Sequence, residues 1–291
     1  MIDGRIIGVD VGGTKIGVGL VEGTQISQYE NFGITADGTE EQVINEVIGA
    51  IESVFRNDVH GIGIGVPSLV DVEKGIVYDV QNIPSWKEVH LKEIIENRFH
   101  KPVFITNDAN CFVVGEKYFG KGKPYSHIVG LTLGTGMGAG IIINNHLYTG
   151  VNCGAGEFGS IPYLSHTYEY YCSGQFFINE YHLQGIEVYE RAMQGDETAL
   201  KIYREFGKHV GNAIIAVLFA VDPEAIFLGG TISKAYPYFK ENMLEIINTF
   251  PYRRTVDRLV IDVTEKTRIA VLGAAALYYD AQGGKLDIAS K

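Results

Sequence analysis

Short apolar runs separated by polar or glycine-rich turns cover the first part of the chain and predict a strand-rich beginning. Residues 5–10, 15–21 and 25–33 each have the composition and length of a strand. Segment 40–55 then carries its apolar residues at helical spacing, and Thr39 stands where an N-cap belongs. The chain is therefore expected to open with three strands and a helix.

Helices and strands alternate after that helix. The sequence predicts a strand at 60–66, a polar loop at 68–90, a helix at 91–99, a strand at 102–106 and a helix at 109–119. Three strands followed by helix, strand, helix, strand and helix form the βββαβαβα plan of a ribonuclease-H-like domain. The first half is therefore expected to be an α/β domain of this kind.

A similar pattern starts again in the second half, where a second glycine turn lies between two apolar runs. The expected elements are strand 128–133, turn 134–136, strand 139–143, an irregular stretch 150–172, helical pieces in 176–193, helix 196–221, strand 225–228, a mostly helical 232–249, strand 259–263 and a terminal helix from 273. We expect two ribonuclease-H-like domains facing a central cleft, where small ligands usually bind. The expected domains are 1–117 and 118–274, with a terminal helix of about 275–291 packing back on the first.

Composition narrows the class of protein. The 291 residues are 46% hydrophobic and carry a formal charge of −11, which argues against binding to nucleic acid or to an anionic membrane. Cys111, Cys153 and Cys172 lack the spacing of a metal or disulfide framework. Neither a signal peptide nor a bilayer-spanning apolar run is evident, so we expect a cytoplasmic protein.

The first glycine turn is the main candidate for anion binding. Asp10 ends an apolar strand, and Gly12, Gly13, Thr14 and Lys15 follow it. Two adjacent glycines let a ligand approach the backbone, while the amides, the hydroxyl and the ammonium can cradle a phosphate. A carboxylate beside such a cradle suits a divalent cation, so Asp10 is a candidate Mg²⁺ ligand. The order of residues differs from a Walker A loop, and a plain glycine hairpin is the alternative.

The second glycine turn superficially matches a dinucleotide fingerprint. Gly134, Thr135 and Gly136 begin a G-x-G-x-x-A stretch, but the β-branched run Ile141–Ile143 follows where the fingerprint needs a helix. We therefore reject the dinucleotide interpretation. As a hairpin turn, the segment could instead hold further phosphate oxygens.

Asn107 and Asp108 lie where a strand ends and a helix begins. In the functional interpretation, Asp108 is a general base that accepts the proton of a sugar hydroxyl as its oxygen attacks a γ-phosphorus. Asn107 would then hydrogen-bond a neighbouring hydroxyl. The alternative is that Asp108 is an ordinary helix N-cap.

Two acidic residues in the irregular stretch complete the candidate chemistry. Glu157 lies among glycines and Glu169 among tyrosines. Carboxylates beside aromatic rings are common in sites that bind a polyol. The alternative for each is a solvated loop charge.

Taken together, these motifs resemble the ROK family, named for repressors, open reading frames and kinases. The resemblance rests on the ordered series of Asp10 with Gly12–Thr14, Asn107–Asn110, Gly134–Gly138, Gly154–Gly159, Glu169 with Ser173–Gly174, and Gly229–Gly230. It implies an actin-like ATPase fold and, in the kinase branch, ATP- and Mg²⁺-dependent phosphorylation of a hexose. It further implies that Asp108 is the catalytic base. The sugar site would be lined by Asn82, Asn107, Glu157 and Glu169. The nucleotide would be surrounded by both glycine turns together with Gly229 and Gly230.

One stretch departs from the family pattern. Many members carry a His three residues after the Glu157 position and a cysteine-rich segment that binds a structural zinc. Here Ser160 takes the place of that His, 161–168 contains no cysteine, and His166 is a lone imidazole. We therefore predict no structural zinc, with Cys172 an ordinary buried thiol.

The resemblance leaves several functions open. A glucokinase-like hexose kinase acting at the 6-hydroxyl is the leading interpretation, with an N-acetylmannosamine or β-glucoside kinase as alternatives. A sugar-sensing, non-catalytic regulator is the alternative of another class, although only nine residues precede Asp10. Closure of the domains over the sugar and a homodimer are also expected.

Overall fold

The computed structural model of the protein describes residues 4–80 and 82–283. The described chain forms two compact units. The first unit takes its described residues from within the ranges Met1–Ser126, Gly140–Ala155 and Glu265–Lys291, and the second from His127–Ala139 and Gly156–Thr264. The expected helical stretch beyond residue 283 lies outside the described residues.

The first unit is built on a five-stranded sheet with the order β3-β2-β1-β4-β8. Its strands are β1 (Arg5–Val11), β2 (Lys15–Glu22), β3 (Gln25–Gly33), β4 (Val59–Val66) and β8 (Val103–Asn107). The first three strands pair antiparallel, whereas β1, β4 and β8 run parallel. The carboxyl ends of the parallel strands therefore meet at one edge, which collects the end of β1 and the start of the helix after β8.

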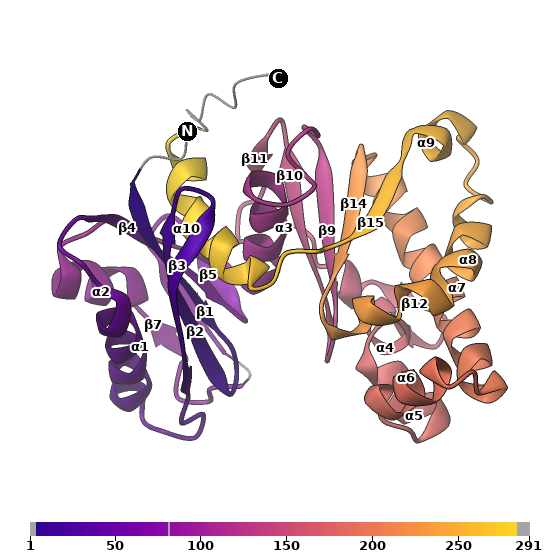
Figure 1. Cartoon of the computed structure of the whole chain (residues 1–291), viewed down its shortest axis with the longest axis horizontal. Coiled ribbons are helices and arrows are strands. Elements are labelled where there is room, and N and C mark those ends of the chain that lie inside the picture. The colour runs from indigo at the N-terminus through magenta and orange to yellow at the C-terminus, as the bar shows by residue number, and fades with distance from the viewer. Residues whose placement is uncertain (1–3, 81, 284–291) are drawn as a thin grey trace. The chain divides into compact units, whose positions relative to one another are not determined.

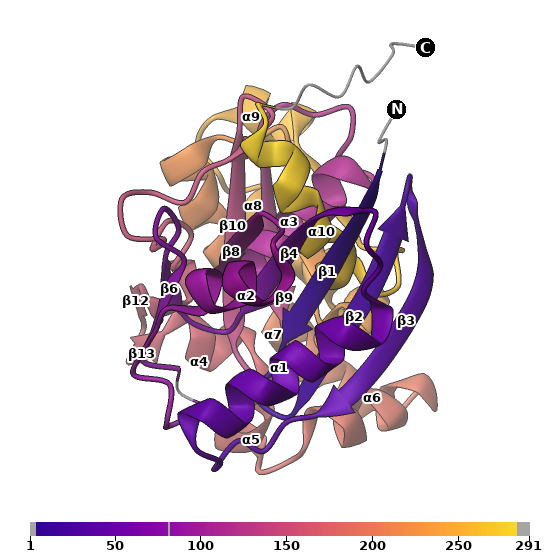
Figure 2. The ribbon, with the colours of Figure 1, turned by 90° about the vertical axis from the view of Figure 1, so that its left-hand side faces the viewer.

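Helices cover both faces of this sheet (Figures 1 and 2). They are α1 (Glu40–Val54), α2 (Leu91–Phe99), α3 (Asp108–Tyr118) and α10 (Ile269–Ala281). The apolar sides of α1 and α2 share one core with the sheet, and the Thr39 hydroxyl caps α1 by accepting a hydrogen bond from the Gln42 amide at 3.2 Å. The predicted elements and the predicted cap are thus confirmed.

The helix α10 lies unusually close to the sheet because glycines face it. A Cβ on Gly8 would approach the Val271 carbonyl oxygen to 2.0 Å, and a Cβ on Gly63 would approach that of Ala274 to 1.7 Å. The same helix packs on α3 through Gly273, where a Cβ would lie 1.7 Å from the Cys111 carbonyl oxygen. Backbone therefore meets backbone at these contacts, and no side chain fits between.

The segment expected to be a polar loop at 68–90 contains three short strands instead. They are β5 (Leu69–Asp71), β6 (Ile76–Tyr78) and β7 (Glu88–Val89), which form a small sheet in that order. The loop prediction was wrong because its apolar residues are widely spaced yet buried: Val77, Ile83 and Trp86 have no exposed surface. Their burial fixes this segment against the core of the first unit.

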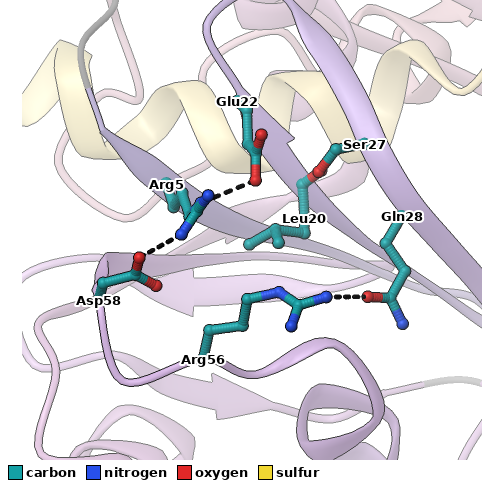
Figure 3. Close-up of polar contacts among 7 residues, drawn as sticks. All are labelled: Arg5, Leu20, Glu22, Ser27, Gln28, Arg56 and Asp58. Carbon is teal, nitrogen blue, oxygen red and sulfur yellow. Dashed lines mark hydrogen bonds and ion pairs between the residues drawn. The ribbon is translucent and has the colours of Figure 1, made fainter.

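Polar contacts join the amino-terminal strands at the surface (Figure 3). The Arg5 guanidinium donates to Glu22 at 2.7 Å and also pairs with Asp58, while Arg56 donates to the Gln28 side-chain Oε1 at 3.1 Å. These contacts link β1, β2 and β3 to the loop before β4. Because they are exposed, each contributes little to stability.

A second five-stranded sheet has the order β11-β10-β9-β14-β15. Its strands are β9 (Ile128–Leu133), β10 (Met137–Ile143), β11 (His146–Leu147), β14 (Ala225–Gly229) and β15 (Val260–Val263). β9, β14 and β15 are parallel, so the turn after β9 and the turn after β14 lie at the same edge. The boundary between the two compact units falls within β10.

The rest of the second unit is mainly helical. Its elements are η1 (Phe158–Ser160), β12 (Pro162–Tyr163), β13 (His166–Thr167), α4 (Tyr168–Cys172), α5 (Gly174–Tyr181), α6 (Gly185–Met193), α7 (Glu197–Val221), η2 (Thr231–Ala235), α8 (Tyr236–Ile247) and α9 (Arg253–Arg258). The helix predicted at 196–221 is α7, and Asp196 caps it by accepting hydrogen bonds from the amides of Thr198 at 2.8 Å and Ala199 at 3.1 Å. The short helix α9 is an element that the apolar pattern did not predict, because none of its residues is buried.

Both halves thus combine a mixed sheet with covering helices, and the α/β class expected from the sequence is confirmed. Across residues 4–80 and 82–283, no helix combines the length and hydropathy that a bilayer-spanning segment requires.

Candidate functional site

The turn between β1 and β2 is closed by one backbone hydrogen bond. The Gly12 amide donates to the Lys15 carbonyl oxygen at 2.8 Å, and Val11 pairs with Ile16 just outside the turn. The Gly12 N–H is thereby engaged, so phosphate donors from this turn would have to be supplied by Gly13, Thr14 and Lys15. The side chains of Thr14 and Lys15 are exposed and accessible to a ligand.

The same turn lies directly against Asn82. A Cβ on Gly13 would stand 2.7 Å from the Asn82 Cβ and 3.0 Å from its Cγ. Only glycine leaves room for this side chain without a shift. The first unit thus brings a residue assigned to phosphate and a residue assigned to sugar into contact.

Asp10 lies near the carboxyl end of β1, between strands that carry glycine beside it. Gly17 of β2 and Gly65 of β4 are its partners across the sheet. Burial, and secondly the negative charge of Asp108, raises the pKa of Asp10 to about 6. A carboxylate in this setting would be stabilised as an anion by a cation, which is the electrostatic situation of a metal ligand.

The end of β8 leads straight into α3, and Asn107 caps that helix. The Asn107 Oδ1 accepts a hydrogen bond from the Ala109 amide at 2.8 Å, and the Asp108 Oδ1 accepts from the same amide at 2.8 Å. Asn107 also donates through Nδ2 to the Ser68 carbonyl oxygen at 3.3 Å. The N-cap position belongs to Asn107, and Asp108 is the first residue of the helix with an exposed side chain.

The buried side chain of Asn110 stabilises the junction between β8 and α3. Asn110 donates to the Thr106 hydroxyl at 3.0 Å and to the Cys153 sulfur at 3.6 Å. The Cys111 thiol is fully buried, and burial, followed by the charges of Asp10 and Asp108, raises its pKa well above the usual range. Cys111 therefore stays a protonated thiol and is a poor nucleophile.

The second unit holds its own glycine turn, between β9 and β10. The Gly134 amide donates to the Gly136 carbonyl oxygen at 3.0 Å, which leaves Thr135 exposed at the tip. Gly230, with φ of +81°, packs beside it, since a Cβ there would lie 2.3 Å from the Leu133 carbonyl oxygen. The structure therefore brings together two predicted nucleotide segments at one edge of the second sheet: the 134–136 turn and the Gly229–Gly230 pair.

Glu169 accepts a hydrogen bond from the residue that follows this second turn. Its Oε2 accepts a hydrogen bond from the Met137 amide at 3.0 Å, and its Oε1 accepts from the Gln175 side chain at 3.2 Å. A Cβ on Gly136 would come within 2.5 Å of the Oε2. Glu169 is therefore not a freely solvated loop charge, which removes the alternative interpretation for this residue.

Glu157 precedes the short helix η1 and has an exposed side chain without a capping hydrogen bond. Gly156 before it has φ of +98° and packs where a Cβ would lie 2.5 Å from the Ala139 carbonyl oxygen. Desolvation of the carboxyl group, and secondly the charge of Glu169, raises the pKa of Glu157. The negative charge of Glu169 therefore acts on Glu157, and both residues belong to the second unit.

The prediction of no structural zinc concerns Ser160 and His166, and among the described residues neither belongs to a group of side chains that could hold a metal ion. Ser160 is exposed at the end of η1, and His166 stacks on Tyr170 with ring centroids 3.9 Å apart. Within residues 4–80 and 82–283, no group of three or more His, Cys, Asp or Glu side chains is arranged to hold a metal ion. A Mg²⁺ ion needs fewer protein ligands, because it keeps several waters and binds substrate phosphates. The absence of zinc stays a prediction.

Several contacts of the candidate residues were not predicted from the sequence. Ser68 accepts from Asn107, Gln175 donates to Glu169, and the Thr231 hydroxyl is the nearest atom to the open side of Gly134, 3.9 Å from where a Cβ would stand. Only Thr231, directly after the Gly229–Gly230 pair, had a signal in the sequence. The other two lie in segments whose residue types are unremarkable.

Known proteins resemble the chain over most of its length. A model of the ROK family matches residues 6–281. The chain is 30% identical to a glucokinase of Thermotoga maritima over 96% of this chain and 99% of that protein. It is 29% identical to the xylose repressor of Bacillus subtilis over 86% of this chain and 70% of the repressor.

A solved structure shows the same fold. The ROK family glucokinase of Streptomyces griseus, in complex with glucose and AMPPNP, superposes with a TM-score of 0.79 at 28% identity, covering 94% of this chain and 99% of that one. The family resemblance drawn from the motifs is therefore confirmed, and with it the actin-like ATPase fold expected for them. The chain belongs to the ROK family.

Proposed function

We propose that the protein is an ATP-dependent hexose kinase, which transfers the γ-phosphoryl group of ATP to a hydroxyl of glucose or a related hexose. The glucokinases among its relatives and the glucose and AMPPNP complex of the Streptomyces griseus enzyme support this function. One observation on the chain itself supports it: Asn107, not Asp108, holds the N-cap position of α3, and the negative charge of Asp108 is close enough to raise the pKa of Asp10. Because Asn107 occupies that position, α3 does not need Asp108 as its N-cap.

In this proposal, Asp108 accepts the proton of the attacking sugar hydroxyl as the new O–P bond forms and the bond to the β–γ bridging oxygen breaks. Asn107 and Asn82 hold neighbouring hydroxyls from the first unit. Glu157 and Glu169 do so from the second. Because each accepts or donates in a fixed direction, together they orient the sugar and limit which hydroxyl can react.

The phosphate contacts are assigned to the two glycine turns. Gly13, Thr14 and Lys15 supply donors from the first unit, and Gly134–Gly136 with Gly229 and Gly230 supply them from the second. Gly12 contributes by its small size, since its amide is engaged in the turn. We assign Mg²⁺ to Asp10, where the ion would neutralise charge on the transferred phosphate. A homodimer is part of the proposal, with light scattering as its check.

A coupled assay that detects ADP, run over a panel of hexoses with and without Mg²⁺, tests the function. The panel should hold glucose, mannose, N-acetylmannosamine and a β-glucoside, because these sugars would use similar hydrogen bonds. Turnover with one of them that requires Mg²⁺ is the expected result. Absence of ADP formation with every sugar, from protein that still binds a hexose in calorimetry, would point instead to a sugar sensor.

A sensor is the second candidate because a xylose repressor is among the relatives. The presence of both Asp10 and Asp108 argues for catalysis, because a kinase needs a carboxylate for the metal ion and a base for the sugar hydroxyl, whereas a sugar sensor needs neither. The assay above separates the two functions.

A further inference from the structure

The position of Glu169 depends on a very short helix. Helix α4 has five residues, and Thr167 caps it by accepting a hydrogen bond from the Tyr170 amide at 3.4 Å. A helix of this length has no stability of its own in water. Packing by its neighbours must therefore determine where Glu169 lies.

That packing comes from an aromatic group which we call the tyrosine–histidine cluster: Tyr163, Tyr168, Tyr171 and His209. Tyr163 from β12 stacks on Tyr168 with centroids 4.5 Å apart and planes 17° apart, and meets Tyr171 edge-on at 5.5 Å. The rings of Tyr171 and His209 lie 4.8 Å apart. Two residues of α4 are thus held by rings from other elements.

His209 connects the cluster to the long helix α7. The Tyr163 hydroxyl and the His209 Nδ1 lie 3.3 Å apart and share a hydrogen bond. Burial lowers the pKa of His209 and raises the pKa of Tyr163 to about 12, so at neutral pH a neutral imidazole faces a protonated phenol, and the imidazole tautomer decides which of the two donates. The hairpin of β12 and β13 is thereby fastened to a 25-residue helix.

The cluster adjoins the proposed sugar residues. Tyr168 and Tyr170 flank Glu169 in sequence, and α4 packs on η1, the short helix that follows Glu157. A Cβ on Gly159 of η1 would lie 3.5 Å from the Cβ of Glu169. A shift of α4 would consequently move Glu169 away from its partners Met137 and Gln175.

We propose that the tyrosine–histidine cluster is a positioning device for Glu169, which sets the affinity for the sugar acceptor by fastening α4 and the β12–β13 hairpin to α7. The inference rests on the proposed function for its sugar readout. None of the cluster residues is itself assigned to the substrate. They act through Glu169.

The test compares Tyr163→Leu, which removes ring and hydroxyl, with Tyr163→Phe, which removes the hydroxyl alone. The matched control is Tyr252→Leu, an exposed tyrosine of the same unit that packs edge-on against Phe250. We expect Tyr163→Leu to raise the KM for the sugar about tenfold, the equivalent of one hydrogen bond to a charged group, while the KM for ATP changes less than about twofold. Tyr163→Phe should show a smaller rise of the same kind, and the control none.

A double-mutant cycle with Glu169→Gln identifies the route of the effect. If the cluster acts through Glu169, Tyr163→Leu costs little further sugar affinity once the carboxylate is gone. Additive losses in the cycle, or equal rises of both KM values, would overturn the proposal. If Tyr163→Leu does not fold, the same cycle with Tyr163→Phe decides.

Hydrogen exchange supplies a readout that needs no activity. Tyr163→Leu should speed exchange of the amides in 166–172 and leave those of α8 unchanged. Unchanged exchange in 166–172 would contradict the positioning role. If the wild type lacks kinase activity, this experiment still tests the cluster, so failure of the proposed function and failure of this inference remain distinguishable.

Discussion

Gly13 and Asn82 are in contact: a Cβ placed on Gly13 would stand 2.7 Å from the Cβ of Asn82, closer than side-chain carbons approach each other. The contact joins the turn after β1 to the segment between β6 and β7 within one unit. It makes the glycine at this position a requirement for the orientation of Asn82, whatever ligand the turn binds.

Gly13→Ala should therefore weaken sugar binding, because Asn82 must move to make room. We expect the KM for the hexose to rise by about tenfold, the worth of one well-placed hydrogen bond. Gly33→Ala is the matched control, since nothing lies within 4 Å of a Cβ at the end of β3. Calorimetry with the sugar alone checks the effect, and unaltered affinity in Gly13→Ala would remove Asn82 from the sugar site.

The close approach of α10 to the first sheet gives a prediction for stability. Gly63→Ala would put a Cβ 1.7 Å from the Ala274 carbonyl oxygen, and the atoms that it meets belong to the backbone of α10, which cannot rotate away as a side chain can. We expect a loss of about 3 kcal/mol or more in the free energy of unfolding.

Gly49→Ala in α1 is the comparison, because that position faces open space. It should stabilise the protein by about 0.5–1 kcal/mol through helix propensity. Urea denaturation of both variants measures the two effects. Equal stabilities for Gly63→Ala and the wild type would show that α10 does not pack as described.

The raised pKa of Asp10 predicts a pH dependence. Because its folded-state pKa is about 6, against an ordinary value of 3.8, the folded state holds a proton that the unfolded state has lost between these values. Its contribution to stability is therefore present below about pH 4 and is lost as the pH rises through about 6.

Asp10→Asn removes the free-energy cost of keeping an ionised carboxylate buried in the folded protein. The stability of the variant relative to the wild type should increase from pH 4 to pH 6 and then level off, reaching roughly 2 kcal/mol after allowance for solvent screening. Thermal denaturation in the absence of nucleotide and metal follows the difference. A difference independent of pH would mean that Asp10 is an ordinary ionised carboxylate in the folded protein.

Sequence patterns anticipated most of the fold because long apolar runs dominate it. β1, β9, α1 and α7 were predicted within one or two residues, since each has a clear period and an end signal such as Asp196. The strands β5 to β7 were not, because isolated residues such as Trp86 are buried by tertiary contacts that a local pattern cannot show.

The candidate site was predictable in its residue types and not in its contacts. Glycine turns and strand-end carboxylates predict an anion site from the sequence. The roles given to Asp10, Asp108 and Glu169 remain predictions. That Asn107 rather than Asp108 caps α3 depends on backbone angles, with ψ of 151° at Asn107. Two neighbouring residues with capping side chains give no such information in sequence.

The prediction of no structural zinc can be checked on purified protein. The segment 161–168 is held by the tyrosine–histidine cluster, so it should not need a metal to keep its place. Treatment with a chelator should leave the melting temperature unchanged, and elemental analysis should find no stoichiometric zinc. One zinc per chain would show that a site has been overlooked.

The central claim is that Asp108 is the catalytic base and that Asn107 caps the helix. Asp108→Asn keeps the size of the side chain and an oxygen for the Ala109 amide, yet removes the group that accepts a proton. The most direct measurement is the kcat of Asp108→Asn with ATP and the preferred hexose, together with the melting temperature of the same preparation. We predict a loss in kcat of about a hundredfold or more, in the range typical of a general base, at a nearly unchanged melting temperature. Near-normal kcat with a lowered melting temperature would contradict the account and make Asp108 a structural residue.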